Sequence, residues 1–185
     1  MAVSTPPGDL ASPAPELLLP GVDGRTYQTR DFAGAHCLLV VFTCNHCPYA
    51  QAVEDRIIAL QNEYPQAQLQ VVAVCSNDAT AYPDDAPDKL KERWTKKAMP
   101  FPYLVDESQQ VAKAFGAVCT PDFFLYDSDR ALRYRGRLDD NWKEPTKVSK
   151  RELKEAVDAI LGGKQPSAAQ SPSMGCGIKW RPSAP

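Results

Sequence analysis

The 185-residue sequence lacks any apolar run that approaches the length of a membrane span. Its first ten residues, MAVSTPPGDL, lack the basic and apolar parts of a secretory signal. An excess of charge is also absent, since 21 Lys and Arg stand against 23 Asp and Glu and the net charge is -2. No strong field therefore favours nucleic acid or an anionic membrane as a partner. We expect a cytoplasmic protein with small-molecule or protein partners.

The cysteines do not form the pattern of a disulfide-rich scaffold. The six cysteines are spread along the chain. Its hydrophobic content of 43% is enough to form one sizeable core without disulfides. Cys37 and Cys75 lie within or at the end of apolar runs, where a free cysteine usually packs as a small hydrophobic side chain. Only Cys44 and Cys47 have the spacing of a motif.

Proline and small residues mark the two ends of the chain. Residues 1–15 have a composition that predicts a flexible N-terminal tail, and residues 164–185 predict a C-terminal tail. The C-terminal tail contains the segment G-C-G-I-K-W at 175–180, whose apolar residues predict that it docks on the rest of the protein. Residues 16–163 between the tails predict a single domain.

The hydrophobic pattern predicts an alternation of strands and helices. Residues 16–29 read as two short strands around a glycine turn, which predicts an N-terminal β-hairpin. The run at 37–43 is apolar on both alternating faces, as expected for a central parallel strand. The remaining expected elements are a helix from Pro48 to Tyr64, a strand at 69–74, a helix at 88–97, a strand at 101–105, a helix at 108–115, strands at 122–126 and 132–137, and a helix from Ser149 to Leu161 with Glu152 completing a capping box.

The most informative motif is Cys44-Asn45-His46-Cys47, at the junction of the central strand and the following helix. Unpaired N–H groups and the helix dipole stabilise a thiolate at a helix N-terminus, and a second cysteine three residues away can form a disulfide with it. This placement predicts a dithiol redox centre, with a structural metal half-site as the alternative. An imidazole at His46 would favour the thiolate and an oxidising potential, unless His46 is only an exposed spacer.

The element order, the C-N-H-C-P run and Thr120-Pro121 before a strand resemble the thioredoxin superfamily. Within it the chain resembles the peroxiredoxin-like redoxin branch, close to the alkyl hydroperoxide reductase and thiol-specific antioxidant group. The matching stretches are F-T-C-N-H-C-P-Y at 42–49, S-N-D at 76–78, Y-P-D-D at 82–85, F-P-Y-L-V-D at 101–106, G-A-V-C-T-P-D at 116–122 and G-C-G-I-K-W at 175–180. The resemblance implies an α/β thioredoxin-like fold over residues 16–163, with a central mixed sheet flanked by helices and the N-terminal hairpin as an extension.

The resemblance also implies roles for individual residues. Cys44 would be the exposed nucleophile and Cys47 the more buried resolving thiol. Pro121 would form a cis peptide bond opposite the dithiol and expose the backbone of Thr120 to an extended substrate. Cys119 and Cys176 are possible additional redox thiols, the alternatives being a buried thiol at a strand end and simple hydrophobic anchoring of the tail.

We therefore expect a thiol-disulfide oxidoreductase that acts on protein or small-molecule disulfides and depends on an upstream thiol reductant. It needs no dissociable cofactor and no metal, because the sulfurs carry the two electrons. One alternative is a thiol peroxidase that reduces peroxides through Cys47, although Cys44 replaces the threonine of that pattern and the supporting arginine is missing. Another is a copper-binding or copper-delivery protein with soft ligands from Cys44, His46 and Cys47 together with His36 or Cys176.

Overall fold

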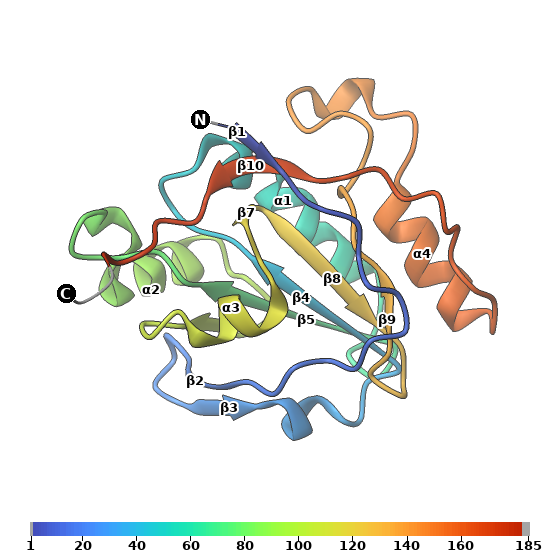
Figure 1. The fold of residues 1–185 in the computed structure, drawn as a ribbon, viewed down its shortest axis with the longest axis horizontal. Coiled ribbons are helices and arrows are strands. Elements are labelled where there is room, and N and C mark those ends of the chain that lie inside the picture. The colour runs from blue at the N-terminus through green and yellow to red at the C-terminus, as the bar shows by residue number, and fades with distance from the viewer. Residues whose placement is uncertain (1, 183–185) are drawn as a thin grey trace.

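A five-stranded mixed sheet forms the centre of the protein in a computed structural model that describes residues 2–182 (Figure 1). The strand order is β6-β5-β4-β8-β9. Strands β4, β5 and β6 run parallel, while β8 is antiparallel to β4 and β9 is antiparallel to β8. The strands are β4 (Cys37–Phe42), β5 (Leu69–Cys75), β6 (Tyr103–Val105), β8 (Asp122–Tyr126) and β9 (Leu132–Tyr134). This arrangement confirms the α/β architecture predicted from the sequence.

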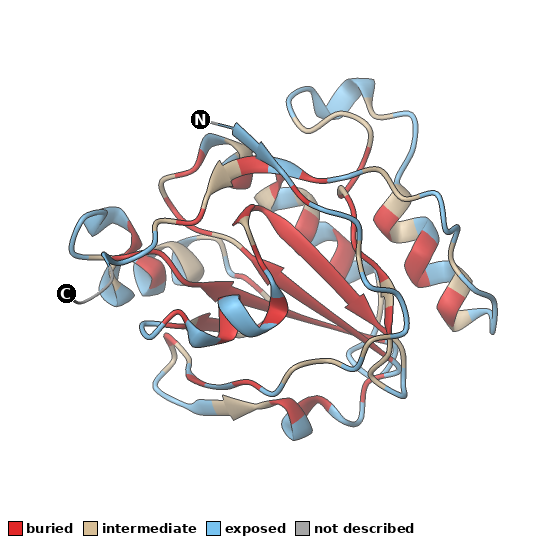
Figure 2. Ribbon diagram, viewed as in Figure 1, coloured by how far each residue is buried: buried red, intermediate tan, exposed pale blue. Residues whose placement is uncertain are grey.

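Strands β4 and β5 lie inside the sheet, and every residue in them is therefore buried. Figure 2 shows them as continuous red strands. Successive side chains of a strand point to opposite faces, so the two strands supply both of the hydrophobic cores. One core contains side chains of α1 (Pro48–Glu63), α2 (Pro87–Lys96) and α4 (Glu152–Leu161). The other contains side chains of α3 (Gln110–Phe115) and of the hairpin formed by β2 (Leu18–Pro20) and β3 (Thr26–Gln28). The predicted hairpin is thus confirmed.

The start of α4 corrects one sequence-based prediction. The expected capping box at Ser149 and Glu152 is wrong, because the helix begins at Glu152 and no side chain caps it. The Ser149 backbone N–H and hydroxyl both donate to Asp140, and Glu152 instead accepts two hydrogen bonds from Arg137. Partners outside the helix therefore compete successfully for both members of the box.

A second, small sheet joins the two ends of the chain and was not predicted. Its order is β1-β10-β7, formed by β1 (Ala2–Ser4), β10 (Met174–Gly177) and β7 (Cys119–Thr120) (Figure 1). The expected flexible tail over residues 1–15 therefore differs from the structure, in which β1 is paired and Pro13 forms a bridge with Ala131. Backbone hydrogen bonds hold this segment in place, and the amino-acid composition does not predict them. The expected docking of the segment 175–180 is observed in β10.

None of the helices between residues 2 and 182 is both long and apolar enough to cross a membrane.

Candidate active site

The Cys44–Cys47 motif lies where the chain leaves β4 and enters α1. Cys47 is the N-cap residue of α1, and Pro48 takes the first helical position, where a missing N–H is not costly. The two thiols lie close enough to shift each other's pKa. Cys44 is only 2% exposed and Cys47 is fully buried. The expectation of an exposed Cys44 is therefore wrong, because neighbouring segments cover both sulfurs.

The loop that carries Thr120 and Pro121 faces the two sulfurs. The Thr120–Pro121 peptide bond is cis, as predicted. The Cys44 Sγ lies 3.2 Å from the Thr120 hydroxyl, and the Cys47 thiol donates to the Thr120 carbonyl oxygen at 3.1 Å. Both cysteines therefore contact the residue that precedes the cis proline.

Asp85, from the segment before α2, is a site residue that the sequence analysis missed. Its buried carboxylate accepts hydrogen bonds from the backbone N–H of Asn45 at 2.7 Å and of His46 at 3.2 Å. It also contacts His46 Nδ1 at 2.5 Å and accepts from Asn77 Nδ2 at 2.9 Å. The Tyr82 ring stacks on the imidazole with centroids 4.8 Å apart. His46 is thus held in one orientation and is not a free spacer.

The environment of Cys47 favours its thiolate. A hydrogen bond from the Cys44 thiol is the largest influence, and the Cys176 thiol, the Ala50 backbone N–H and the Thr120 hydroxyl add further hydrogen bonds. Together they outweigh burial and lower the pKa of Cys47 to about 4. The position of Cys47 at the start of α1 acts in the same direction, because the first N–H groups of a helix lack intrahelical partners. The contact with the Thr120 carbonyl oxygen acts in the other direction, because that oxygen accepts a hydrogen bond only from the thiol form of Cys47.

The environment of Cys44 favours its thiol. Its role as hydrogen-bond donor to Cys47, its burial and the charge of Asp85 all raise the pKa of Cys44. The Cys44 sulfur, a ring nitrogen of His46 and a carboxylate oxygen of Asp85 lie within 4.8 Å of one another. The surroundings therefore favour the thiol form of Cys44 and the thiolate form of Cys47.

Of the two additional candidate thiols, Cys176 contacts the dithiol. It lies on β10 directly opposite Thr120, is half-buried, and packs against the core cluster that contains Cys47. Burial and the neighbouring Cys47 raise the pKa of Cys176 to about 11. Cys119 is fully buried, its thiol donates to the Pro121 carbonyl oxygen at 3.6 Å, and burial raises its pKa. This geometry favours packing as the role of Cys119.

Cys44, His46 and Asp85 also form the one cluster of potential metal ligands among residues 2–182. A carboxylate suits zinc better than copper(I), which prefers thiolate and thioether ligands. His36 precedes β4, whereas Cys44 follows it, so the two residues lie at opposite ends of that strand. The expected copper-ligand set is therefore not formed with His36, whereas the alternative set with Cys176 is brought together, because Cys176 lies beside Cys47.

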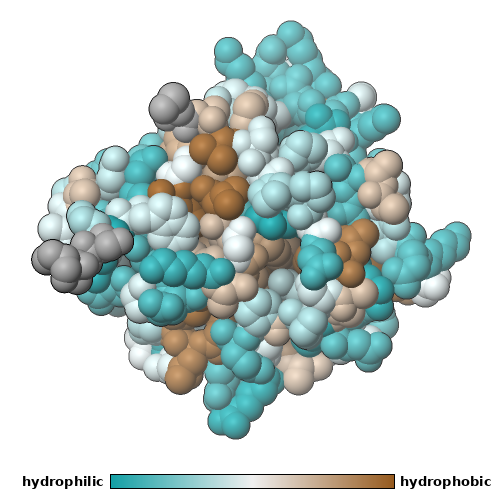
Figure 3. Space-filling view, in the orientation of Figure 1, coloured by the Kyte–Doolittle hydropathy of each residue, from teal (hydrophilic) through white to brown (hydrophobic). Residues whose placement is uncertain are grey.

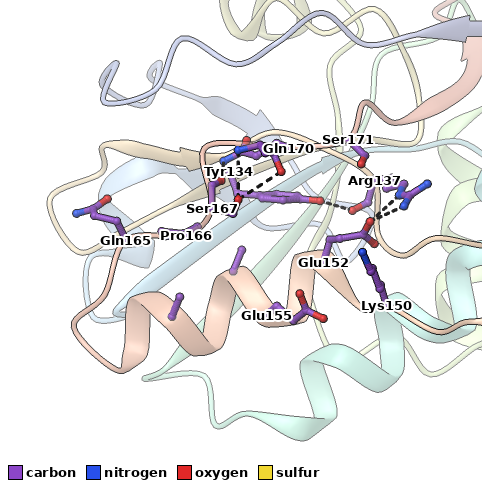
Figure 4. A pocket seen from close by; sticks show the side chains of 13 residues that line it. Tyr134, Arg137, Lys150, Glu152, Glu155, Gln165, Pro166, Ser167, Gln170 and Ser171 are labelled. Atoms are coloured by element: carbon purple, nitrogen blue, oxygen red, sulfur yellow. Dashed lines mark hydrogen bonds and ion pairs between the residues drawn. The ribbon is translucent and has the colours of Figure 1, made fainter.

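Of the hollows outside the dithiol, two are lined in part by Arg137. The larger of these two, of about 360 Å³, lies between α4 and the C-terminal segment, where Arg137 pairs with Glu152 and Tyr134 donates to the Arg137 carbonyl oxygen (Figure 4). Its lining contains no cysteine. The smaller, of about 110 Å³, lies beside Pro121 and is bordered by Trp142 and Met174. This smaller hollow directly adjoins the site.

The fold and the cysteine pair opposite a cis-proline loop define a thioredoxin-like protein with a candidate dithiol centre. Residues 7–154 match the family model for Redoxin, and the chain belongs to that family. No curated protein matches the chain.

Solved structures extend this result. An uncharacterized conserved protein from Geobacillus kaustophilus is 40% identical, with a TM-score of 0.93 over 100% of this chain and 98% of that one. A hypothetical protein from Sinorhizobium meliloti 1021 is 39% identical, with a TM-score of 0.91 over 96% of this chain and 98% of that one. A thiol:disulfide interchange protein of the thioredoxin family from Chlorobium tepidum TLS is 17% identical, with a TM-score of 0.58 over 68% and 84% of the two chains. The last similarity shows the fold alone.

Proposed function

We propose that this protein is a thiol-disulfide oxidoreductase in which Cys44 and Cys47 carry the two electrons. The observation that carries the proposal is the position of Cys47 at the start of α1, with a lowered pKa and with the Cys44 thiol hydrogen-bonded to it. A stable thiolate beside a protonated partner is what dithiol exchange requires. Membership of the Redoxin family supports this assignment.

In the proposed reaction, the Cys47 thiolate attacks an incoming sulfur and forms a mixed disulfide. Cys44 then loses its proton and attacks the Cys47 sulfur, so that the incoming group leaves as a thiolate and a Cys44–Cys47 disulfide forms. Asp85 and His46 lie beside Cys44 and are placed to accept this proton. An external thiol reductant restores the dithiol, and no dissociable cofactor takes part.

Serine substitutions test both the reaction and the order of attack. With insulin or glutathione disulfide as substrate and dithiothreitol as reductant, Cys47→Ser should abolish turnover. Cys44→Ser should stop turnover and accumulate a disulfide through Cys47. Cys37→Ser, a buried cysteine at the far end of β4, is the matched control and should retain turnover.

Two results would overturn this account. Turnover by Cys44→Ser and Cys47→Ser at the rate of the unmodified protein would exclude the dithiol as the redox centre. Accumulation of a mixed disulfide on Cys44 in the Cys47→Ser protein would restore the order implied by the sequence resemblance.

Peroxide reduction is a second candidate, because a thiolate at Cys47 directly followed by Pro48 would be a suitable nucleophile for a peroxide. Attack would give a sulfenic acid, which Cys44 could convert to a disulfide. We rank it second because Cys44 occupies the position at which the peroxidase pattern has threonine. Stopped-flow mixing of reduced protein with hydrogen peroxide decides the matter, and we expect oxidation no faster than that of a free thiol.

A further inference from the structure

Strand β10 occupies the edge of the cis-proline loop. It pairs antiparallel with β7, with Cys176 opposite Thr120 and Gly177 opposite Cys119. An extended polypeptide bound at such an edge would form the same backbone hydrogen bonds. The other edge of β10 is covered by β1, so β10 itself has no free edge for an incoming strand.

At Gly175 the backbone of β10 lies against the Thr120–Pro121 backbone. A Cβ atom at this position would lie 2.0 Å from the Thr120 carbonyl oxygen and 2.5 Å from its carbonyl carbon. Gly177, two residues further along the same strand, has room, because a Cβ atom there would be 3.5 Å from Val3 Cγ2 as its nearest neighbour. Close approach of the strand to the site therefore requires glycine at 175 and not at 177.

Contacts at both ends of β10 fix it in place. Before the strand, the Ser173 hydroxyl donates to the Pro121 carbonyl oxygen at 2.8 Å, and the Thr5 backbone N–H donates to the Ser173 carbonyl oxygen at 2.9 Å. After the strand, Ile178 is buried in a hydrophobic core, and the Lys179 N–H donates to Asn77 Oδ1 at 2.8 Å. A thiol held in this way meets its neighbour at high effective concentration.

Apolar side chains gather over β1 and β10 on the face shown in Figure 3. Val3 is 37% exposed and Met174 is 39% exposed. Cys176 is half-buried, whereas Cys44 and Cys47 are buried. Of these three thiols, Cys176 is therefore the most open to a disulfide that approaches from solvent.

We propose that Cys176 is a third catalytic thiol, which exchanges with small-molecule disulfides at the surface and passes electrons to them from the buried Cys44–Cys47 pair. This inference rests on the proposed function and adds the substrate class. Because β10 fills the edge on which a peptide would pair, extended polypeptides are poor substrates.

The relay consists of three exchanges. Cys176 attacks one sulfur of the substrate R–S–S–R′ as its proton passes to the neighbouring Cys47 thiolate. From Cys47 the proton goes to the departing R′–S⁻, and a Cys176–S–R bond forms. The Cys47 thiolate attacks the Cys176 sulfur, which forms a Cys47–Cys176 disulfide and releases R–S⁻. Cys44 attacks the Cys47 sulfur, and its proton returns to the departing Cys176. The substrate gains two electrons, and the Cys44–Cys47 pair is oxidised to a disulfide.

Trapping tests the intermediate. Reduced Cys44→Ser protein is mixed with one equivalent of glutathione disulfide, alkylated under acid quench and mapped by mass spectrometry. The expected product is a Cys47–Cys176 disulfide. Glutathione bound stably to Cys47, with Cys176 alkylated, would overturn the relay while leaving the proposed function intact.

Turnover assays with glutathione disulfide and with insulin test the role of Cys176 and the covering of the β7 edge by β10. Cys176→Ser, with β10 still in place, should slow the reduction of glutathione disulfide by about tenfold or more. Gly175→Ala should displace β10 and raise insulin reduction several-fold, whereas Gly177→Ala should match the unmodified protein, and circular dichroism checks that all three fold. Full turnover by Cys176→Ser would refute the third thiol. Equal insulin reduction by the two alanine variants would refute occlusion by β10. The activity of the Cys47→Ser variant tests the proposed function independently of these two results.

Discussion

The location of the thiolate is the sharpest consequence of the site geometry. In the reduced protein, Cys47→Ser should remove a thiolate that is present near neutral pH, and Cys44→Ser should leave it in place. Cys44→Ser retains a hydroxyl that can donate a hydrogen bond to Cys47, as the thiol of Cys44 does in the structure. The neighbouring Asp85 opposes a charge on Cys44 and has no such effect on the serine variant.

The expected size of the effect follows from the pKa of Cys47. With a pKa of about 4, the Cys47 thiol is almost fully ionised at pH 7. An unperturbed cysteine, with a pKa of about 8.5, is only about 3% ionised at pH 7. The difference is roughly a thirtyfold increase in thiolate, which an absorbance measurement at one wavelength can resolve.

The assay is a pH titration of thiolate absorbance near 240 nm, run on the reduced protein and on both serine variants. We expect one thiolate that disappears only in acid, in the unmodified protein and in Cys44→Ser. The pKa of Cys47 is lower in the folded than in the unfolded chain, so its contribution to stability is present at high pH and is lost as the pH falls through about 4. The stability advantage over Cys47→Ser should shrink accordingly. A low-pKa thiolate that survives in Cys47→Ser and vanishes in Cys44→Ser would refute this reasoning.

Three further substitutions probe the supporting structure. Asp85→Asn should lower the pKa of Cys44 and, by leaving a buried N–H without a good acceptor, reduce the free energy of unfolding by about 1–3 kcal/mol; an unchanged urea midpoint would argue against it. Arg135→Met should cost about 3–5 kcal/mol, because it leaves the buried carboxylate of Asp122 without its partner at 2.9 Å; a calorimetric loss below 1 kcal/mol would contradict a tight pair. Ile178→Ala removes a buried side chain that anchors the C-terminal segment. Such a change in a protein core lowers the free energy of unfolding by about 2–5 kcal/mol. Hydrogen exchange should show faster local opening there, and unaltered protection would show that the anchor is not needed.

The central sheet could be predicted from the sequence because its signal is local and strong. The runs at 37–42 and 69–75 are apolar and rich in β-branched residues, and both are buried throughout. The start of α1 is equally local, since Pro48 directly follows the N-cap residue Cys47. The sequence therefore sufficed to predict that Cys44 and Cys47 lie at the junction of β4 and α1.

The small sheet and the surroundings of the dithiol depend on contacts between distant segments. β1 and β10 pair although they are separated by nearly the whole chain, and neither the three residues of β1 nor the glycine-containing β10 carries a strand pattern. Asp85 approaches His46 from 39 residues away. Its run Y-P-D-D predicts a turn, but a turn does not show what its carboxylate will contact. The acid–base properties of Cys44 and Cys47 follow from these contacts, so the sequence alone could not assign them.

Disulfide mapping tests the central claim most directly. Fully reduced protein is oxidised with one equivalent of glutathione disulfide, quenched in acid, alkylated and mapped by mass spectrometry. The account predicts that the final product contains a Cys44–Cys47 disulfide with two equivalents of reduced glutathione released. Consumption of the oxidant with both Cys44 and Cys47 still alkylated would contradict it.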